Sequence, residues 1–262
     1  MNHRIKKLTT AVLATALLAS NSTVAQKGAT NGEWHANGGG KGAAKYAPLT
    51  QITPENFKDL KIAWTWDSID NTLETGDPRI RKHTFQPTPI MANGVLYLNT
   101  SLSQVAAIDA GTGKTLWTYD PGSWREGRPA NMGFIQRGVS YWADGDDERV
   151  IVPTGNNRLI ALNAKTGKPI PSFGDNGEIN LREGLNRVPR LAESQVNSPP
   201  MIVNDVIVTG CVVFDRPSTK SFVRGDIRGF DVRTGKKLWT FHSIPQEGEF
   251  GNETWTDDAW KV

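Results

Sequence analysis

The sequence is poor in the residues that most often bind metals through sulfur or imidazole. It has one cysteine, Cys211, among 262 residues. A single cysteine excludes an intramolecular disulfide, a cysteine-based zinc cluster and a Cys-x-x-Cys-His haem site within these residues. The four histidines show no close metal-ligand spacing, and they are His3, His35, His83 and His242. The sequence therefore points away from thiol and histidine metal sites.

The amino-terminal region lacks an apolar run long enough to cross a membrane. Three basic residues within the first seven precede the uncharged run Leu8–Ala19, and small residues follow at Thr23–Ala25. This order is typical of a secretory signal peptide. A membrane anchor is the alternative, but a spanning helix needs about 20 apolar residues. We expect residues 1–25 to be cleaved, with no transmembrane helix in the mature segment and a periplasmic location.

The mature segment also lacks an excess of charge of either sign. Removing residues 1–25 removes three basic side chains, so 30 − 3 = 27 Lys and Arg stand against 27 Asp and Glu. Nucleic-acid or acidic-membrane binding depends on a concentration of positive charge. The composition therefore argues against a nucleic-acid partner. No cysteine stands near the cleavage site, which excludes a lipid anchor there.

A short turn motif, Asp/Asn-x-x-Thr-Gly-Lys, occurs three times, at Asp109–Lys114, Asn163–Lys168 and Asp231–Lys236. Its first side chain can accept hydrogen bonds from the turn, and its glycine can adopt a positive φ. Apolar runs precede each copy and are separated by turn residues at Asn93-Gly94, Gly155–Asn157 and Asn204-Asp205. Each copy therefore predicts an antiparallel meander of about four strands.

The spacing of the copies favours a β-propeller. The threonines lie 166 − 112 = 54 and 234 − 166 = 68 residues apart, and Trp117 and Trp239 follow two of the turns. We expect these indoles to wedge between neighbouring blades; in the second copy Pro171 replaces the tryptophan, and Phe173 fills part of the space. A solenoid and a set of unrelated hairpins are the alternatives. A closed ring needs roughly four to eight blades. We expect about three blades plus an amino-terminal segment, with residues 26–262 as the amino-terminal part of a longer propeller domain.

Several longer blocks resemble one enzyme family. The docking turn with its tryptophan, RGVSYW at Arg137–Trp142 and GEFGNETW at Gly248–Trp255 are similar to quinoproteins, the dehydrogenases that use pyrroloquinoline quinone (PQQ). Ile227–Pro245 resembles the branch that contains membrane-type glucose dehydrogenases and related sugar and alcohol dehydrogenases. The resemblance implies an all-β, eight-bladed propeller with PQQ and Ca²⁺ near its axis.

The resemblance also implies roles for three residues. Arg137 stands at the family position that contacts PQQ, and a guanidinium suits a cofactor with three carboxylates. Thr154 matches a threonine that hydrogen-bonds the cofactor, and Asp215 matches a carboxylate ligand of Ca²⁺. A structural ion pair, a strand threonine and a solvated loop carboxylate are the respective alternatives. The catalytic residues of the family would follow Val262, and their identity is unknown here.

The expected activity is oxidation of a sugar or alcohol hydroxyl, with electrons passed to a quinone or to cytochrome c. The alternative is a non-catalytic propeller of the same repeat type that acts as a periplasmic protein-interaction scaffold. Relatives place two adjacent cysteines or a histidine against one face of PQQ, whereas this chain has Asn131-Met132-Gly133 in that neighbourhood.

Overall fold

The computed structural model describes residues 29, 32–40, 42–74, 76–80, 84–130, 133–213 and 223–261. The segment 1–25, interpreted as a signal peptide, and Asp215 lie outside these residues. Over the described ranges the regular elements are β-strands and short 3-10 helices. In this part of the chain no helix combines the length and apolarity that crossing a membrane requires.

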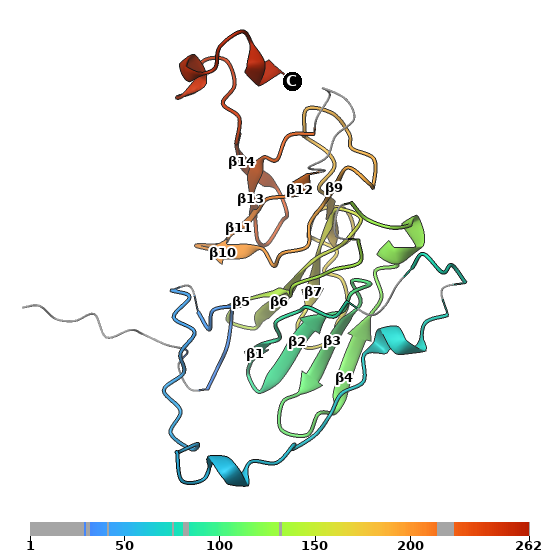
Figure 1. Cartoon of the computed structure of the whole chain (residues 1–262), viewed down its shortest axis with the longest axis vertical. Helices are drawn as coiled ribbons and strands as arrows, with labels where there is room; N and C mark the ends of the chain where they lie inside the picture. Colours follow the sequence, from blue (N-terminus) through green and yellow to red (C-terminus); the bar gives the residue numbers. More distant parts are fainter. Residues whose placement is uncertain are drawn as a thin grey trace, which may run out of the picture.

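The strands form three four-stranded antiparallel sheets, each a meander in which every strand pairs with the next one of its sheet (Figure 1). The first sheet contains β1 (Ile90–Ala92), β2 (Val95–Asn99), β3 (Val105–Asp109) and β4 (Thr115–Tyr119). The second contains β5 (Ser140–Asp144), β6 (Asp147–Pro153), β7 (Arg158–Asn163) and β8 (Glu178–Asn180). The third contains β10 (Met201–Val203), β11 (Val206–Thr209), β13 (Ile227–Asp231) and β14 (Lys237–Phe241). The prediction of three four-stranded blades is confirmed.

The remaining elements are short and lie between or outside the sheets. A two-stranded ladder pairs β9 (Ser194–Gln195) with β12 (Val212–Val213). The 3-10 helices are η1 (Phe57–Asp59), η2 (Ile69–Thr72), η3 (Ser123–Glu126), η4 (Asn252–Thr254) and η5 (Ala259–Lys261). The long segments before β1 and after β14 carry little regular structure, and the one after β14 extends away from the sheets (Figure 1).

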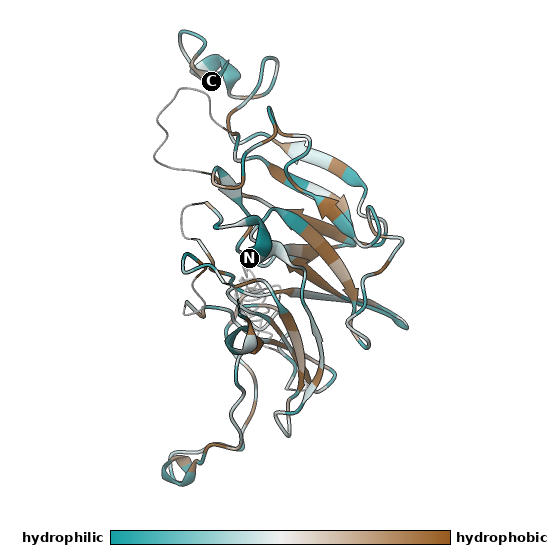
Figure 2. Ribbon diagram, turned by 90° about the vertical axis from the view of Figure 1, so that its right-hand side faces the viewer, coloured by the Kyte–Doolittle hydropathy of each residue, from teal (hydrophilic) through white to brown (hydrophobic). Residues whose placement is uncertain are grey.

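The hydrophobic core is divided between the interfaces of neighbouring sheets. Along β7, Ile160 and Leu162 pack toward the first sheet, whereas Leu159 and Ala161 pack toward the third. All four side chains are at most 1% exposed. A strand covered on both faces must be apolar at every position, which explains the unbroken run Leu159–Leu162. In Figure 2 the apolar residues accordingly lie in the strands and the hydrophilic ones mainly in the connections.

The three repeated turns share one geometry. In the first, Asp109 Oδ1 accepts hydrogen bonds from the Thr112 backbone N–H at 2.8 Å and from the Thr112 hydroxyl at 2.7 Å. The same two bonds form in the second and third copies. The turn glycines have φ values of +74°, +69° and +73°, in the order Gly113, Gly167 and Gly235. The sequence prediction for these turns is confirmed.

A tryptophan lies on the repeated turn at the first two copies. The Trp117 indole N–H, from the first sheet, donates to the Ala164 carbonyl of the second sheet's turn at 2.9 Å. A Cβ atom added to Gly167 would lie 2.5 Å from the Trp117 ring, so a larger residue does not fit at this position. Trp64, from the segment before β1, lies on Gly113 in the same way and donates to the Ala110 carbonyl at 3.1 Å. The predicted wedge between sheets is therefore confirmed for Trp117, and each indole docks onto the turn of the following sheet.

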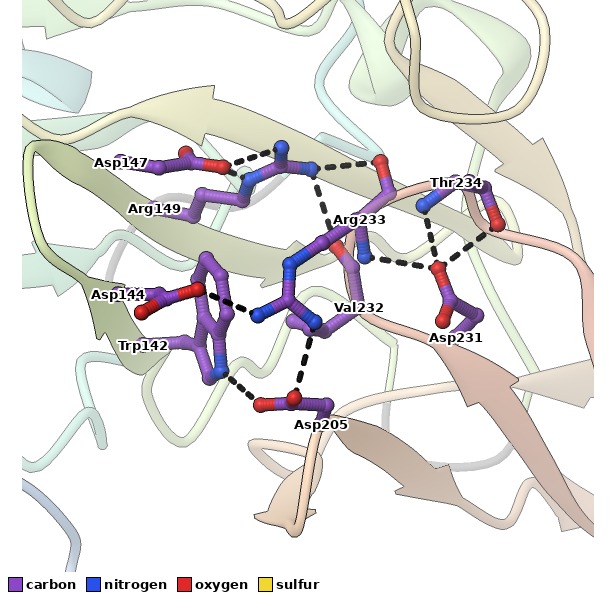
Figure 3. A network of polar contacts seen from close by, with 9 residues as sticks. All are labelled: Trp142, Asp144, Asp147, Arg149, Asp205, Asp231, Val232, Arg233 and Thr234. Atoms are coloured by element: carbon purple, nitrogen blue, oxygen red, sulfur yellow. Dashed lines mark hydrogen bonds and ion pairs between the residues drawn. The ribbon is translucent and has the colours of Figure 1, made fainter.

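The interface between the second and third sheets uses different residues. Phe173 is fully buried in the core between these sheets, as expected for a residue that fills the missing tryptophan's space. The polar contact comes from Arg149, whose Nη1 donates to the carbonyls of Val232 at 3.1 Å and Arg233 at 2.7 Å (Figure 3). Val232 holds the position in its turn that Ala164 holds in the second. A guanidinium from β6 thus replaces an indole as the donor to this carbonyl.

A second arginine strengthens the same interface. Arg233, in the third turn, forms ion pairs with Asp144 at 2.7 Å and Asp205 at 2.9 Å (Figure 3). Its guanidinium carbon lies 4.7 Å from the centre of the Trp142 ring, and the Trp142 indole N–H donates to Asp205 at 2.9 Å. Charged side chains therefore fix the turns of the second and third sheets to each other.

A buried carboxylate attaches the amino-terminal segment to the first sheet. Asp70, in η2, is 1% exposed. It accepts hydrogen bonds from the Thr100 hydroxyl at 2.6 Å, the Ser101 hydroxyl at 2.8 Å, the Leu102 N–H at 3.2 Å and the Gln104 amide at 2.7 Å. Four donors satisfy a carboxylate that would be costly to bury alone. Asp70 therefore anchors this segment to the loop between β2 and β3.

Candidate functional site

The connections of the three sheets gather at two opposite ends. The hairpins such as Asn93-Gly94 and the Thr-Gly turns lie at one end. The loops between β2 and β3, between β6 and β7, and from β4 to β5 lie at the other, which we call the loop end. A hydrogen bond from the Gly155 N–H to the Ser103 hydroxyl, 3.1 Å long, joins the loop ends of the first and second sheets. Arg137 and Thr154 both belong to the loop end.

Arg137 is half-buried, and its backbone is held on both sides. Its N–H donates to the Asn197 carbonyl at 2.8 Å, and its carbonyl accepts from the Thr88 N–H at 3.1 Å. Arg137 lines a cavity of about 290 Å³ between β5 and β10, together with His35, Ser198 and other residues. An arginine in such a hollow offers several planar donors to an anionic ligand.

A second cavity of about 330 Å³ lies beside the first and shares Ser198, Pro199 and Met201 with it. Its wall includes Thr209 and Cys211. Burial raises the pKa of the Cys211 thiol. The thiol is therefore held in its neutral form, which is a poor nucleophile and metal ligand. These two adjoining hollows form the concave surface on which a ligand at the loop end would rest.

Thr154 is fully buried, and its hydroxyl is engaged within its own turn. It donates to Asn156 Oδ1 at 2.6 Å and accepts from the Arg158 N–H at 2.9 Å. To donate a hydrogen bond to a cofactor, this hydroxyl would have to give up its bond to Asn156. The role of Thr154 as a cofactor contact stays a prediction.

The segment Ser194–Asn197 links the loops that carry the candidate residues. The Ser194 carbonyl accepts from the amide of Asn157 at 2.7 Å, in the loop of Thr154. The Asn197 carbonyl accepts from the Arg137 N–H. The pairing of β9 with β12 brings it beside Val213, two residues before Asp215. Sequence reasoning missed this segment, because SQVN carries no motif and its partners are far away in the sequence.

The loop before this segment is held by Glu193. Its carboxylate accepts from Arg187 at 2.8 Å and from Arg190 at 2.8 Å. Hydrogen bonds from Arg187 and then Arg190 lower the pKa of Glu193 to about 2. The Glu193 side chain is 16% exposed, so solvent screens these contacts only in part.

This lowered pKa predicts a pH-dependent stability. The pKa of an unfolded glutamate is about 4.3, so the contribution of Glu193 is present above that pH and is lost as the pH falls toward 2. Glu193→Gln should lower the free energy of unfolding by on the order of 1 kcal/mol at pH 7, and by less at pH 3. Urea unfolding at pH 7, 5, 4 and 3 measures both values.

Asp77→Asn is the matched control for that experiment. The pKa of Asp77 is also lowered to about 2, but by Arg79, whose side chain is 84% exposed. A smaller effect is expected there, because an exposed pair two residues apart contributes little to the folded state. Equal losses at pH 7 and pH 3 for Glu193→Gln would contradict the prediction.

Comparison with known proteins decides the family. Residues 34–262 match the model of the PQQ family described as "Glucose/ethanol/alcohol dehydrogenase, beta-propeller domain". The chain belongs to this quinoprotein family. The fold predicted from the sequence, an all-β propeller built from four-stranded antiparallel blades, is thereby confirmed.

Over the aligned region, the chain is about one-third identical to curated quinoproteins. The chain is 33% identical to a quinoprotein glucose dehydrogenase of Gluconobacter oxydans over 80% of this chain and 27% of the relative. It is 32% identical to quinohemoprotein alcohol dehydrogenase ADH IIB of Pseudomonas putida, over 88% of this chain and 30% of that protein. The chain thus spans less than a third of the length of these relatives.

Solved structures of quinoprotein dehydrogenases support the same fold. The quinohemoprotein alcohol dehydrogenase of Comamonas testosteroni superposes with a TM-score of 0.61 at 28% identity, over 82% of this chain and 28% of that one. A europium-containing methanol dehydrogenase superposes with a TM-score of 0.56 at 19% identity, over 80% of this chain and 32% of that one, which supports the fold alone.

The chemistry of Arg137 fits PQQ. Arg137 in its cavity supplies the donors that a planar, multiply anionic group requires. Over the described ranges, no group of three or more His, Cys, Asp or Glu side chains could hold a metal. Asp215 is not among the described residues, so its assignment as a calcium ligand stays a prediction.

Proposed function

We propose that this protein is a PQQ-dependent dehydrogenase that oxidises a hydroxyl group of a sugar or alcohol. The observation that carries the proposal is Arg137, in the RGVSYW block, lining a hollow between the inner strands β5 and β10 at the loop end. Membership of the quinoprotein family supports it. The relatives named above are glucose and alcohol dehydrogenases, so the substrate proposed here is of the same class.

In this proposal the residues of the chain bind and orient the cofactor. PQQ, when bound, supplies a quinone that accepts two electrons from the substrate. Arg137 neutralises and orients its carboxylates, and Thr154 contributes a hydroxyl contact once that hydroxyl has released Asn156. Asp215 supplies carboxylate oxygen to Ca²⁺, a cation that prefers oxygen ligands. The electron acceptor is a quinone or a cytochrome, and the location is the periplasm.

Reconstitution of the full gene product tests this function. The purified protein is incubated with PQQ and Ca²⁺ and desalted, and the retained PQQ is measured by its absorbance. Reduction of an artificial dye is then followed with a panel of sugars and alcohols. Retained PQQ with dye reduction by at least one substrate is expected, and samples without PQQ provide the baseline. Absence of both retention and dye reduction would end the enzyme interpretation.

A further inference from the structure

Gln195, in β9, is fully buried, although glutamine is usually exposed. With its amide oriented to satisfy its neighbours, its nitrogen donates to the carbonyls of Ala130 at 2.9 Å and Gly133 at 3.3 Å. Its oxygen accepts from the Asn197 amide at 3.2 Å. One side chain thus gives two backbone carbonyls outside the strand ladders an additional donor from β9.

The two carbonyls lie just upstream of Arg137. Ala130 is 2% exposed, and Gly133 is also buried. The Gly133 N–H donates to the Ala130 carbonyl at 3.0 Å, and the Ile135 N–H donates to the Gly133 carbonyl at 2.9 Å. Both bonds lie in the stretch that immediately precedes Arg137 in the sequence. A shift at Gly133 would therefore be passed on to the guanidinium four residues later.

The same short segment holds both ends of this stretch. The Gln195 side chain fixes Ala130 and Gly133, and two residues on, the Asn197 carbonyl fixes the Arg137 N–H. The backbone of Gln195 is itself paired with Val212 of β12. The stretch leading to Arg137 is thus hydrogen-bonded to the segment around β9, which is itself paired with β12.

We propose that Gln195 is a positioning residue for cofactor binding. It sets the backbone before Arg137 so that this residue lines its cavity. The inference rests on the proposed function, because it concerns the same cofactor. Gln195 touches no ligand in this scheme; it acts through the carbonyls of Ala130 and Gly133. Without the Gln195 amide each of these buried carbonyls keeps only its local backbone donor, the two are no longer tied to β9, and the stretch from Gly133 to Arg137 loosens.

The main test uses Gln195→Met in the full gene product, since methionine keeps the volume and removes both donors. PQQ affinity is measured by titration with Ca²⁺ present. Amide hydrogen exchange of residues 133–137 is measured without PQQ. We expect about tenfold weaker PQQ binding, the range found when a residue that orients a ligand-binding group is lost. Exchange at residues 133–137 should become faster, while exchange in β6 and β7 stays unchanged.

Gln246→Met is the matched control. The Gln246 amide also donates to a backbone carbonyl, that of Ile244 at 2.6 Å, but in the segment after β14. Its substitution should leave both PQQ affinity and exchange at residues 133–137 unchanged. A purely structural role for Gln195 would lower the melting temperature without changing PQQ affinity, and that result would overturn the proposal.

Gln195→Glu adds a readout that a packing role would not produce. A neutral carboxyl group can donate one of the two lost hydrogen bonds, whereas an ionised one faces two carbonyl oxygens and is repelled. Burial raises the pKa of such a group. PQQ affinity of this variant, relative to wild type, should therefore fall as the pH rises from about 5 to 8. A pH profile parallel to that of wild type would contradict the role.

The outcomes separate this inference from the proposed function. Wild-type protein that does not bind PQQ would overturn both. Wild-type protein that binds PQQ, together with Gln195→Met of equal affinity and equal exchange at residues 133–137, would overturn only the positioning role.

Discussion

Arg137→Ala is expected to weaken PQQ binding by about a hundredfold, which corresponds to about 2.7 kcal/mol. Arg137 lines the cavity between β5 and β10, and in the proposed site its removal leaves a carboxylate of the cofactor without its partner. We take the low end of the range for buried charge pairs because Arg137 is half-buried. Titration of the protein with PQQ, followed by quenching of tryptophan fluorescence, measures the change.

Two further variants make that result specific. Arg137→Lys keeps the charge but loses the planar pair of donors, so it should bind PQQ about tenfold more weakly than wild type. Arg79→Ala removes an arginine that is 84% exposed and should not change the affinity. Arg137→Ala that retains wild-type affinity and a wild-type melting temperature would remove the main support for the proposed cofactor site.

Arg149→Met is expected to lower the free energy of unfolding by about 3 kcal/mol. Arg149 is 5% exposed, and its substitution leaves the carbonyls of Val232 and Arg233 without their guanidinium donor. It also breaks the bidentate pair with Asp147, whose two contacts are 2.8 and 2.7 Å long. Methionine keeps most of the aliphatic volume, so the loss reports mainly on polar contacts. Urea unfolding at pH 7 gives the value.

Arg125→Met is the matched control for this prediction. Arg125 also pairs with an aspartate, Asp120 at 3.1 Å, and lies over a tryptophan ring, that of Trp124 at 4.4 Å. Its side chain is 59% exposed, so a loss below about 1 kcal/mol is expected. Equal losses for the two variants would show that Arg149 does not replace the docking tryptophan at the third turn.

The parts of the fold that could be predicted depend on local chemistry. Asn93-Gly94 and Asn204-Asp205 form their hairpins because their backbones adopt positive φ, from 46° to 74°, which these residue types accept. The Thr-Gly turns form through bonds within five residues of the chain, and Trp117 follows its turn at a fixed distance. Short-range patterns of this kind are visible in a sequence without knowledge of tertiary contacts.

The parts that could not be predicted depend on distant partners. Arg149 lies 83 and 84 residues from the carbonyls it bonds. In the sequence Arg149 lies close to Asp147 at an acidic hairpin tip, a pattern that predicts an exposed ion pair. Gln195 lies in a polar stretch without a motif. Its contacts depend on the loop that contains Ala130 and Gly133, which is more than 60 residues away in the sequence. The engagement of the Thr154 hydroxyl by Asn156 was equally hidden, because it depends on the conformation of the loop.

The direction of indole docking gives the array of sheets a polarity. Trp64 precedes the turn it covers by 46 residues and Trp117 by 47, counted to the carbonyl acceptor. During synthesis from the amino terminus, each of these two receiving turns is therefore made after its indole. The segment before β1 and the first sheet thus each present an indole to the sheet that is made next, so these parts can assemble in order from the amino terminus. Trp239, in β14 of the third sheet, is 40% exposed, and its role as a wedge stays a prediction.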